Sequence, residues 1–254
     1  MKILMQFIRI SVKRILAYPN EIYMVFLQAF VSVVSTALFW AVLFSGEEAY
    51  GHSQEFVYIL AMIALLSNGV QELFFGLRDL EYLVQAGEFD RYLYLPRSPL
   101  LLRLGETLPV VPMCQQILIA LAGIALVTVR FGIMLTPGRF LKCVGFLLLG
   151  TVYYQMIYGA VTFLCLRTEN ISSLRDLIFQ FGDYKQYPLG IFPIVIRFFL
   201  TYIIPMGLVA YYPTVLLLGL DEPLPQLYLA MPLAAAACWW SYRTSIKKYA
   251  SNGG

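Results

Sequence analysis

Long runs of apolar residues are the feature of this 254-residue sequence that most limits how it can fold. A helix that crosses a lipid bilayer needs about 17–25 mostly apolar residues, and it satisfies its own backbone hydrogen bonds there. The sequence is 60% hydrophobic and 13% charged, so it lacks the charged surface that a soluble domain of this length needs. We therefore expect an all-α integral membrane protein with six transmembrane helices, near Ile22–Phe44, Phe56–Phe75, Leu108–Val129, Val144–Leu166, Ile194–Tyr212 and Leu227–Tyr242.

The placement of Lys and Arg predicts the orientation of these helices, because cytoplasmic loops carry an excess of basic residues. With the N-terminus in the cytoplasm, all but three of the 18 basic residues fall on the inner side, and the three exceptions are Arg130, Arg139 and Lys142. An even number of crossings returns the C-terminus to the cytoplasm as well. The net charge of +3 reflects this bias, and no basic run interleaved with exposed aromatics indicates a nucleic-acid partner.

The pattern of residues 1–21 predicts a basic amphipathic helix, the elbow helix, which precedes the six-helix transmembrane domain at 22–254. Polar and apolar residues repeat on different faces at helical spacing: Lys2, Gln6, Arg9 and Lys13 on one, and Leu4, Ile8, Val12 and Ile15 on the other. Such a helix lies in the headgroup layer of a membrane, although a mitochondrial presequence has a similar pattern. Tyr18-Pro19-Asn20 is expected to end it.

Two further segments are expected at the membrane surfaces. An apolar stripe opposite polar residues predicts a cytoplasmic amphipathic segment at about 167–193, between the fourth and fifth spans. The apolar run at 213–220 is too short to cross the bilayer, and Asp221, Glu222, Pro223 and Pro225 follow it. This pattern predicts an external re-entrant segment at about 213–225, packed against protein.

The sequence contains no recognisable catalytic or cofactor motif. His52 is the only histidine, which excludes a zinc site built on two or more histidines. No Walker or G-x-S-x-G motif is present, and we expect no Ser-His-Asp triad. The four cysteines are too widely spaced for a metal motif, and disulfides are not expected: Cys114, Cys143, Cys165 and Cys238. We expect no catalytic residue, metal or cofactor in this chain.

Charged residues are scarce at the centres of the predicted spans. Glu72 and Arg197 are expected within a turn or two of the cytoplasmic ends, where long side chains reach water. Uncharged glutamines remain in the spans and can hydrogen-bond to neighbouring helices: Gln28, Gln71, Gln115, Gln116 and Gln155. This pattern argues against a proton-coupled transporter or an intramembrane hydrolase, so any energy source has to come from elsewhere.

The polar stretch Gln85–Leu101, "QAGEFDRYLYLPRSPLL", lies in an expected cytoplasmic loop at about 77–106. Gly87 allows a backbone bend, and Pro96 and Pro99 stop the following turn from continuing as a helix. Two interpretations are open. The stretch is either a solvated connecting loop with ordinary turn residues, or a rigid elbow whose charges and apolar residues bind a soluble protein.

The stretch "VQAGEFDRYLYLPRSPL" resembles a cytoplasmic segment of the ABC-2-type permeases of ATP-binding-cassette exporters, in which a glycine and an acidic residue precede a leucine-rich turn ending in proline. Tyr187–Gly219 resembles a second signature, found in one bacterial subgroup. The matching residues of this second signature are Tyr187, Pro188, Ile191, Phe192, Pro205 and Pro213. Family members commonly have Leu-Arg-Pro after the acidic turn, where this chain has Tyr94-Leu95-Pro96, so the resemblance assigns no role to Arg97.

The resemblance implies a multi-pass permease subunit of a bacterial inner membrane, paired with a second permease that is either a sister chain or a second copy of itself. A cytoplasmic ATPase dimer would bind ATP and Mg²⁺, so this chain would not itself be an enzyme. The residues expected to couple to that ATPase are Gln85, Gly87, Glu88, Phe89, Asp90 and Arg91. The alternative is an energy-independent membrane scaffold or a secondary carrier, and the sequence does not indicate a substrate.

Overall fold

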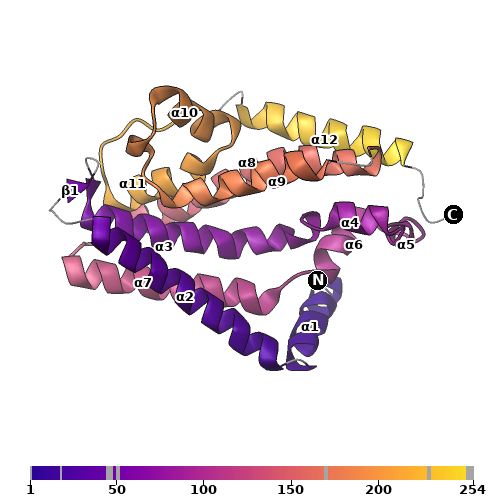
Figure 1. Ribbon diagram of the computed structural model, residues 1–254, viewed down its shortest axis with the longest axis horizontal. Coiled ribbons are helices and arrows are strands. Elements are labelled where there is room, and N and C mark those ends of the chain that lie inside the picture. The colour runs from indigo at the N-terminus through magenta and orange to yellow at the C-terminus, as the bar shows by residue number, and fades with distance from the viewer. Residues whose placement is uncertain are drawn as a thin grey trace.

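The computed structural model describes residues 2–17, 19–43, 48–49, 52–168, 171–227 and 230–249, and these are almost all helical (Figure 1). The expected all-α class is confirmed. Within the described ranges the only strands are β1 Glu48–Ala49 and β2 His52–Ser53, which pair as an antiparallel hairpin. The helices of fifteen or more residues are α1 Lys2–Ala17, α2 Pro19–Leu43, α3 Gln54–Gln71, α7 Val110–Phe131, α8 Pro137–Thr162 and α12 Ala230–Lys248.

Shorter helices connect or extend the long ones. Between α3 and α7 lie η1 Glu72–Leu77, α4 Leu80–Gln85, α5 Asp90–Leu93 and α6 Pro99–Glu106. Between α8 and α12 lie η2 Phe163–Leu166, α9 Ser172–Phe181, η3 Gly182–Gln186, η4 Leu189–Ile191, α10 Ile194–Phe198, η5 Phe199–Ile203, η6 Gly207–Tyr211 and α11 Tyr212–Leu218. The expected helix break at Tyr18 lies outside the described residues.

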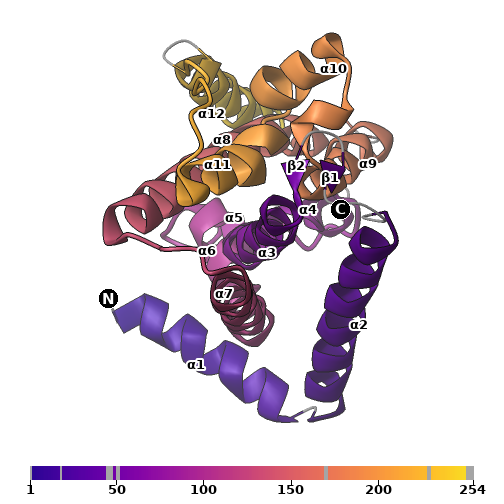
Figure 2. The ribbon, with the colours of Figure 1, turned by 90° about the vertical axis from the view of Figure 1, so that its left-hand side faces the viewer.

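Helix α3 lies at the centre of the bundle, and α1 and α2 lie at its edge (Figure 2). The side chains of α3 are apolar around most of the helix circumference, and Ile59, Leu60 and Ile63 are fully buried. Glycines allow the neighbouring backbones to approach closely. A Cβ at Gly69 would lie 2.7 Å from Ile117 of α7, and one at Gly150 of α8 would lie 2.4 Å from the Leu208 carbonyl oxygen.

Among the residues that the structure describes, three helices are long and apolar enough to cross a membrane: 54–85, 110–131 and 137–166. A fourth crossing is added if the bent pair 194–203 and 207–218 counts as one span. The expected first span corresponds to the 25-residue helix α2, whose apolar described part is Phe26–Val42. The expected sixth span corresponds to α12, which fails the same criterion of length and composition. Six crossings and the orientation of the termini therefore stay predictions.

The region expected to be the fifth span is broken at Pro205, where the two helical arms meet at 76°. Ile204 is extended, with φ −119° and ψ 93°, as a residue before proline usually is. The helix after the break runs without interruption through Pro213, which occupies the first turn of α11. The helical break therefore lies at Pro205, eight residues before residue 213, where the expected re-entrant segment begins.

The segment expected to stay on the cytoplasmic surface, 167–193, instead runs back along the bundle. Its first part lies near α4, where Arg175 pairs with Glu81 at 2.7 Å. Its middle packs on α8, since the Tyr154 hydroxyl donates to the Ile178 carbonyl over 3.4 Å. Its last part reaches the opposite end of the bundle, where the Tyr187 ring lies 6.0 Å from Trp40. This segment is divided into short helices and carries charged residues, so a search of the sequence for long apolar runs does not reveal its course.

Helix α1 forms at the expected place and is attached to the junction between α6 and α7. The Ser11 hydroxyl donates to the Leu108 carbonyl at 2.6 Å and accepts from the Val110 N–H at 3.2 Å. Phe7 packs directly on Gly105 of α6, where a Cβ would lie 2.4 Å from the ring. The N-terminal helix is thus joined to the segment that carries the candidate site, while its place in the headgroup layer stays a prediction.

Candidate coupling site

The predicted coupling residues form a tight turn between α4 and α5, at the end of the bundle where α1 begins and α12 ends (Figure 1). Gly87 has φ +70°, the left-handed conformation that favours glycine. Its N–H donates to the Val84 carbonyl and the N–H of Glu88 to the Leu83 carbonyl, at 3.1 and 3.0 Å. These two bonds form a Schellman motif, which ends α4 and satisfies two of its terminal carbonyls.

Two of the predicted coupling residues face the protein interior. Phe89 is buried, with its ring 5.3 Å from Tyr249 in an edge-to-face arrangement. Asp90 accepts a hydrogen bond of 2.7 Å from the Tyr249 hydroxyl. The turn is therefore attached to the residue that follows α12. Phe89 is buried and Asp90 is partly buried, and their role in coupling to an ATPase stays a prediction.

A second set of polar contacts fastens the turn to α6. Arg91 donates to the Glu106 carboxylate at 3.1 Å and to the Tyr92 hydroxyl at 2.8 Å. The hydrogen bond with Tyr92, assisted by the carboxylate of Glu106, raises the pKa of the Arg91 guanidinium. The Tyr92 hydroxyl also donates to Glu106, and the buried Arg103 pairs with Asp79. These contacts attach the turn to α6.

Glu81 forms a third attachment, which the sequence did not suggest. Its side chain is buried, and it accepts from the Arg175 guanidinium at 2.7 Å and the Ile171 N–H at 3.2 Å. Gln85, a predicted coupling residue, contacts the same carboxylate at 3.5 Å. Breaking a buried ion pair by removing one partner is strongly destabilising. The only sequence signal was an acidic residue on the apolar side of a short helix.

Several side chains of the turn and of α6 remain exposed after these attachments, and most of them are apolar or aromatic. The most exposed are Tyr94 at 85%, Tyr82 at 71% and Leu101 at 68%. We call this set the turn surface; it consists of Tyr82, Glu88, Leu93, Tyr94, Leu95 and Leu101. Of the predicted coupling residues, Gln85, Glu88 and Arg91 are exposed. Gln85 and Arg91 make the side-chain contacts given above, whereas the Glu88 side chain forms no hydrogen bond or ion pair with the described residues.

The residues of the second motif lie at the other end of the bundle and are structural. Tyr187 packs against Trp40, Pro188 is buried, and Phe192 lies edge-to-face with Tyr184 at 5.8 Å. Ile191 is partly buried in the core, Pro205 marks the break described above, and Pro213 is buried in α11. The structure does not bring these residues near the turn surface.

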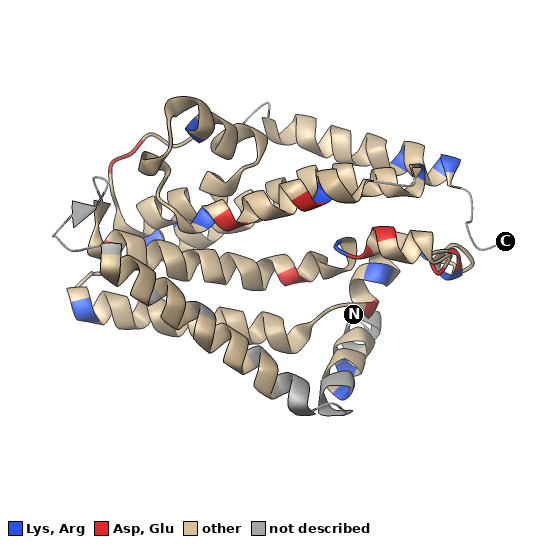
Figure 3. Ribbon diagram, viewed as in Figure 1, with Lys and Arg blue, Asp and Glu red and all other residues tan. Residues whose placement is uncertain are grey.

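Charged residues gather mainly at the two ends of the long helices, with a further group along α9 and η3 (Figure 3). Within the described ranges, no three His, Cys, Asp or Glu side chains are grouped so that they could hold a metal ion.

Apolar helices of spanning length and an exposed turn at one end of the bundle define this chain as a helical membrane protein. A family model described as "ABC-2 family transporter protein" matches residues 8–253, so the chain belongs to the ABC-2 transporter family. The resemblance read from the two motifs is thereby confirmed. Searches of curated proteins and of solved structures found no match.

Proposed function

We propose that this chain is the permease subunit of an ATP-driven exporter and that the turn surface binds its ATPase. Membrane proteins of this family are generally paired with an ATPase component. The observation that carries the proposal is an exposed aromatic and aliphatic surface on a turn fixed by three separate sets of contacts, to α6, to α9 and to the end of α12. The turn can pass movement of the ATPase to the membrane helices only if it is attached rigidly to those helices.

In this proposal ATP and Mg²⁺ are bound by the ATPase dimer, and the chain itself catalyses no reaction. Two permeases, either two copies of this chain or this chain and a sister, form the path across a bacterial inner membrane. Nucleotide-driven movement of the ATPase is passed from the turn surface into α3 through α4 and η1, and into α8 through α9.

The test is to purify the chain co-expressed with its ATPase and to measure how much ATPase stays bound and how fast ATP is hydrolysed. We expect Tyr94→Ala and Glu88→Lys each to weaken complex formation about tenfold or more, because exposed aromatic residues are frequent interface hot spots and a reversed charge disturbs complementarity. Neither change should lower the melting temperature of the chain alone, since both side chains are exposed.

The matched control is Asp221→Lys, which reverses an exposed acid in the segment that follows α11. It should leave binding and hydrolysis unchanged. If Tyr94→Ala and Glu88→Lys retained full binding and full stimulation of hydrolysis, the turn surface would not be the docking site. If no ATPase co-purified with the unaltered chain, the energy-independent scaffold or carrier would replace this proposal.

A further inference from the structure

A cavity of about 550 Å³ lies beside α3, between α7, α9 and η3, away from the turn surface. Its polar lining includes Asn68, Gln71, Glu72, Arg78, Gln116 and Lys185. Glu72, which the sequence placed near water at a helix end, is buried, and it pairs with Arg78 at 3.3 Å. This pair neutralises one of the two basic groups of the cavity and leaves the Lys185 ammonium as the other.

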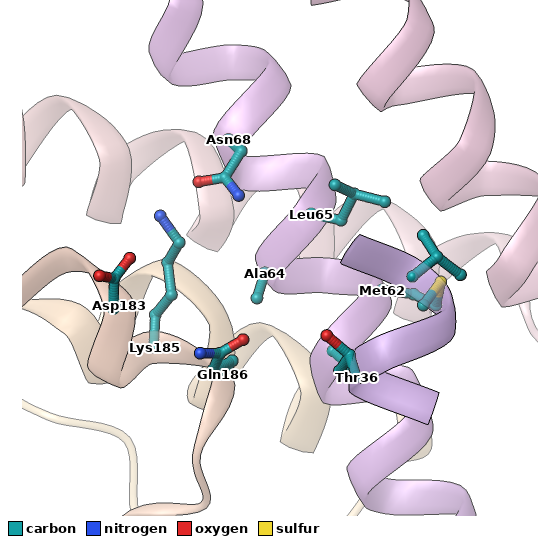
Figure 4. A pocket seen from close by; sticks show the side chains of 10 residues that line it. Thr36, Met62, Ala64, Leu65, Asn68, Asp183, Lys185 and Gln186 are labelled. Carbon is teal, nitrogen blue, oxygen red and sulfur yellow. The ribbon is translucent and has the colours of Figure 1, made fainter. Parts of the chain in front are cut away.

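Lys185 is 93% buried, with 7% of its surface exposed. The carboxylates of Asp183 and Glu72, which line the same cavity, attract its ammonium, but neither forms an ion pair with it among the described residues. The Lys185 side chain is extended, and its ammonium points toward Asn68 beside Asp183 (Figure 4). Asp183 is exposed, so much of its charge is screened by solvent. Burial disfavours the charged form of Lys185 more than these carboxylates favour it, and groups perturbed in this way cluster at functional sites.

The cavity offers a second unused donor. The Nε2 group of Gln71 is buried and has no hydrogen-bonding partner among the described residues. The remaining walls include Leu65, Phe75 and Phe179, which are apolar. The lining also includes the amides of Gln115 and Gln116, and the buried Oε1 atom of Gln116 accepts no hydrogen bond from the described residues. The two inward donors, one of them cationic, fit an anionic group, and the amide oxygens fit a hydroxyl or amine group of the same molecule. The apolar walls favour a hydrocarbon portion.

We propose that this cavity binds an amphipathic molecule through its anionic group, a carboxylate or a phosphate, with Lys185 Nζ and Gln71 Nε2 as the donors. The binding itself does not depend on the ATPase. The proposal rests on the proposed function in one respect only: the bound molecule is then the cargo of transport.

The test uses the purified full-length chain in a neutral detergent and measures binding of octanoate, octyl phosphate and octanol by equilibrium dialysis. We expect saturable binding of at least one of the two anions and none of the alcohol, and the preferred anion identifies the head group. Lys185→Met should weaken anion binding about tenfold or more, because a charge-assisted hydrogen bond is lost. Lys185→Arg should retain it, and Gln71→Leu should weaken it less.

Thermal unfolding of the same variants separates a ligand site from a structural role. Lys185→Met should raise the melting temperature, since it removes a buried charge whose desolvation outweighs its attraction to Asp183 and Glu72. The control Lys142→Met, at an exposed position of α8, should bind the anions as the unaltered chain does. Equal binding by Lys185→Met, equal binding of octanol, or a lowered melting temperature of Lys185→Met would each overturn the proposal. Loss of ATPase binding in Glu88→Lys with intact anion binding would bear on the docking site alone.

Discussion

At the scale of single residues, Gly87 shows most clearly why the sequence of the turn matters. Its φ of +70° places it in the left-handed region, where a side chain clashes with the following carbonyl. We expect Gly87→Ala to destabilise the chain by roughly 1–2 kcal/mol and to lower the melting temperature by about 2–8 °C. Differential scanning calorimetry in nanodiscs measures this change.

The matched control for Gly87 is Gly138→Ala in the first turn of α8. A Cβ there would meet no atom within 4 Å, and its backbone is helical. Alanine also has the higher helix propensity, so this change should be neutral or slightly stabilising. Equal destabilisation by both changes would show that the Schellman motif at Gly87 has no special importance.

At the scale of an element, the break at Pro205 leaves backbone groups that need other partners. Proline has no N–H and interrupts the helical ladder, so the Tyr202 carbonyl accepts its hydrogen bond from outside the helix. The donor is the Tyr153 hydroxyl of α8, at 2.6 Å. The bent arm is thus fixed to α8 by a side chain rather than by its own backbone.

We expect Tyr153→Phe to lower the free energy of unfolding by about 1–3 kcal/mol, because it leaves the partly buried Tyr202 carbonyl without this donor. Calorimetry together with hydrogen exchange at 199–206 checks this, and exchange should increase there first. The exposed Tyr94 serves as the control through Tyr94→Phe, which should change neither quantity. An unaltered exchange pattern in Tyr153→Phe would show that the bend is held by packing alone.

At the scale of the whole molecule, the turn surface and the segment after α11 lie at opposite ends of the bundle (Figure 1). In a background without the four native cysteines, we expect an impermeant maleimide applied to intact cells to label the Asp221→Cys variant and not the Arg97→Cys variant. Inverted vesicles should show the reverse. Both positions are exposed, so the membrane alone decides which one reacts. Labelling of Arg97→Cys from outside would exclude a cytoplasmic ATPase at the turn surface.

The presence of a turn could be predicted from the backbone preferences of its residues. Which of its side chains are buried could not be predicted, because that depends on contacts with residues distant in the sequence. Gly87, Pro96 and Pro99 indicate a turn by their backbone preferences alone. Phe89 and Asp90 contact Tyr249, which lies 159 residues after Asp90. These contacts follow only from the packing of the end of α12 on α5. Lys185 was equally hidden, because a single lysine in a polar stretch carries no signal of burial.

By itself, the sequence determined the membrane class, the helical architecture and the ABC-2 family, because bilayer thickness sets helix length and the lack of water forces backbone groups to pair within helices. Tertiary structure alone decided where 171–187 lies, which residues of the turn face outward and that Lys185 is enclosed. These features depend on contacts between residues distant in sequence, and no periodic pattern records such contacts.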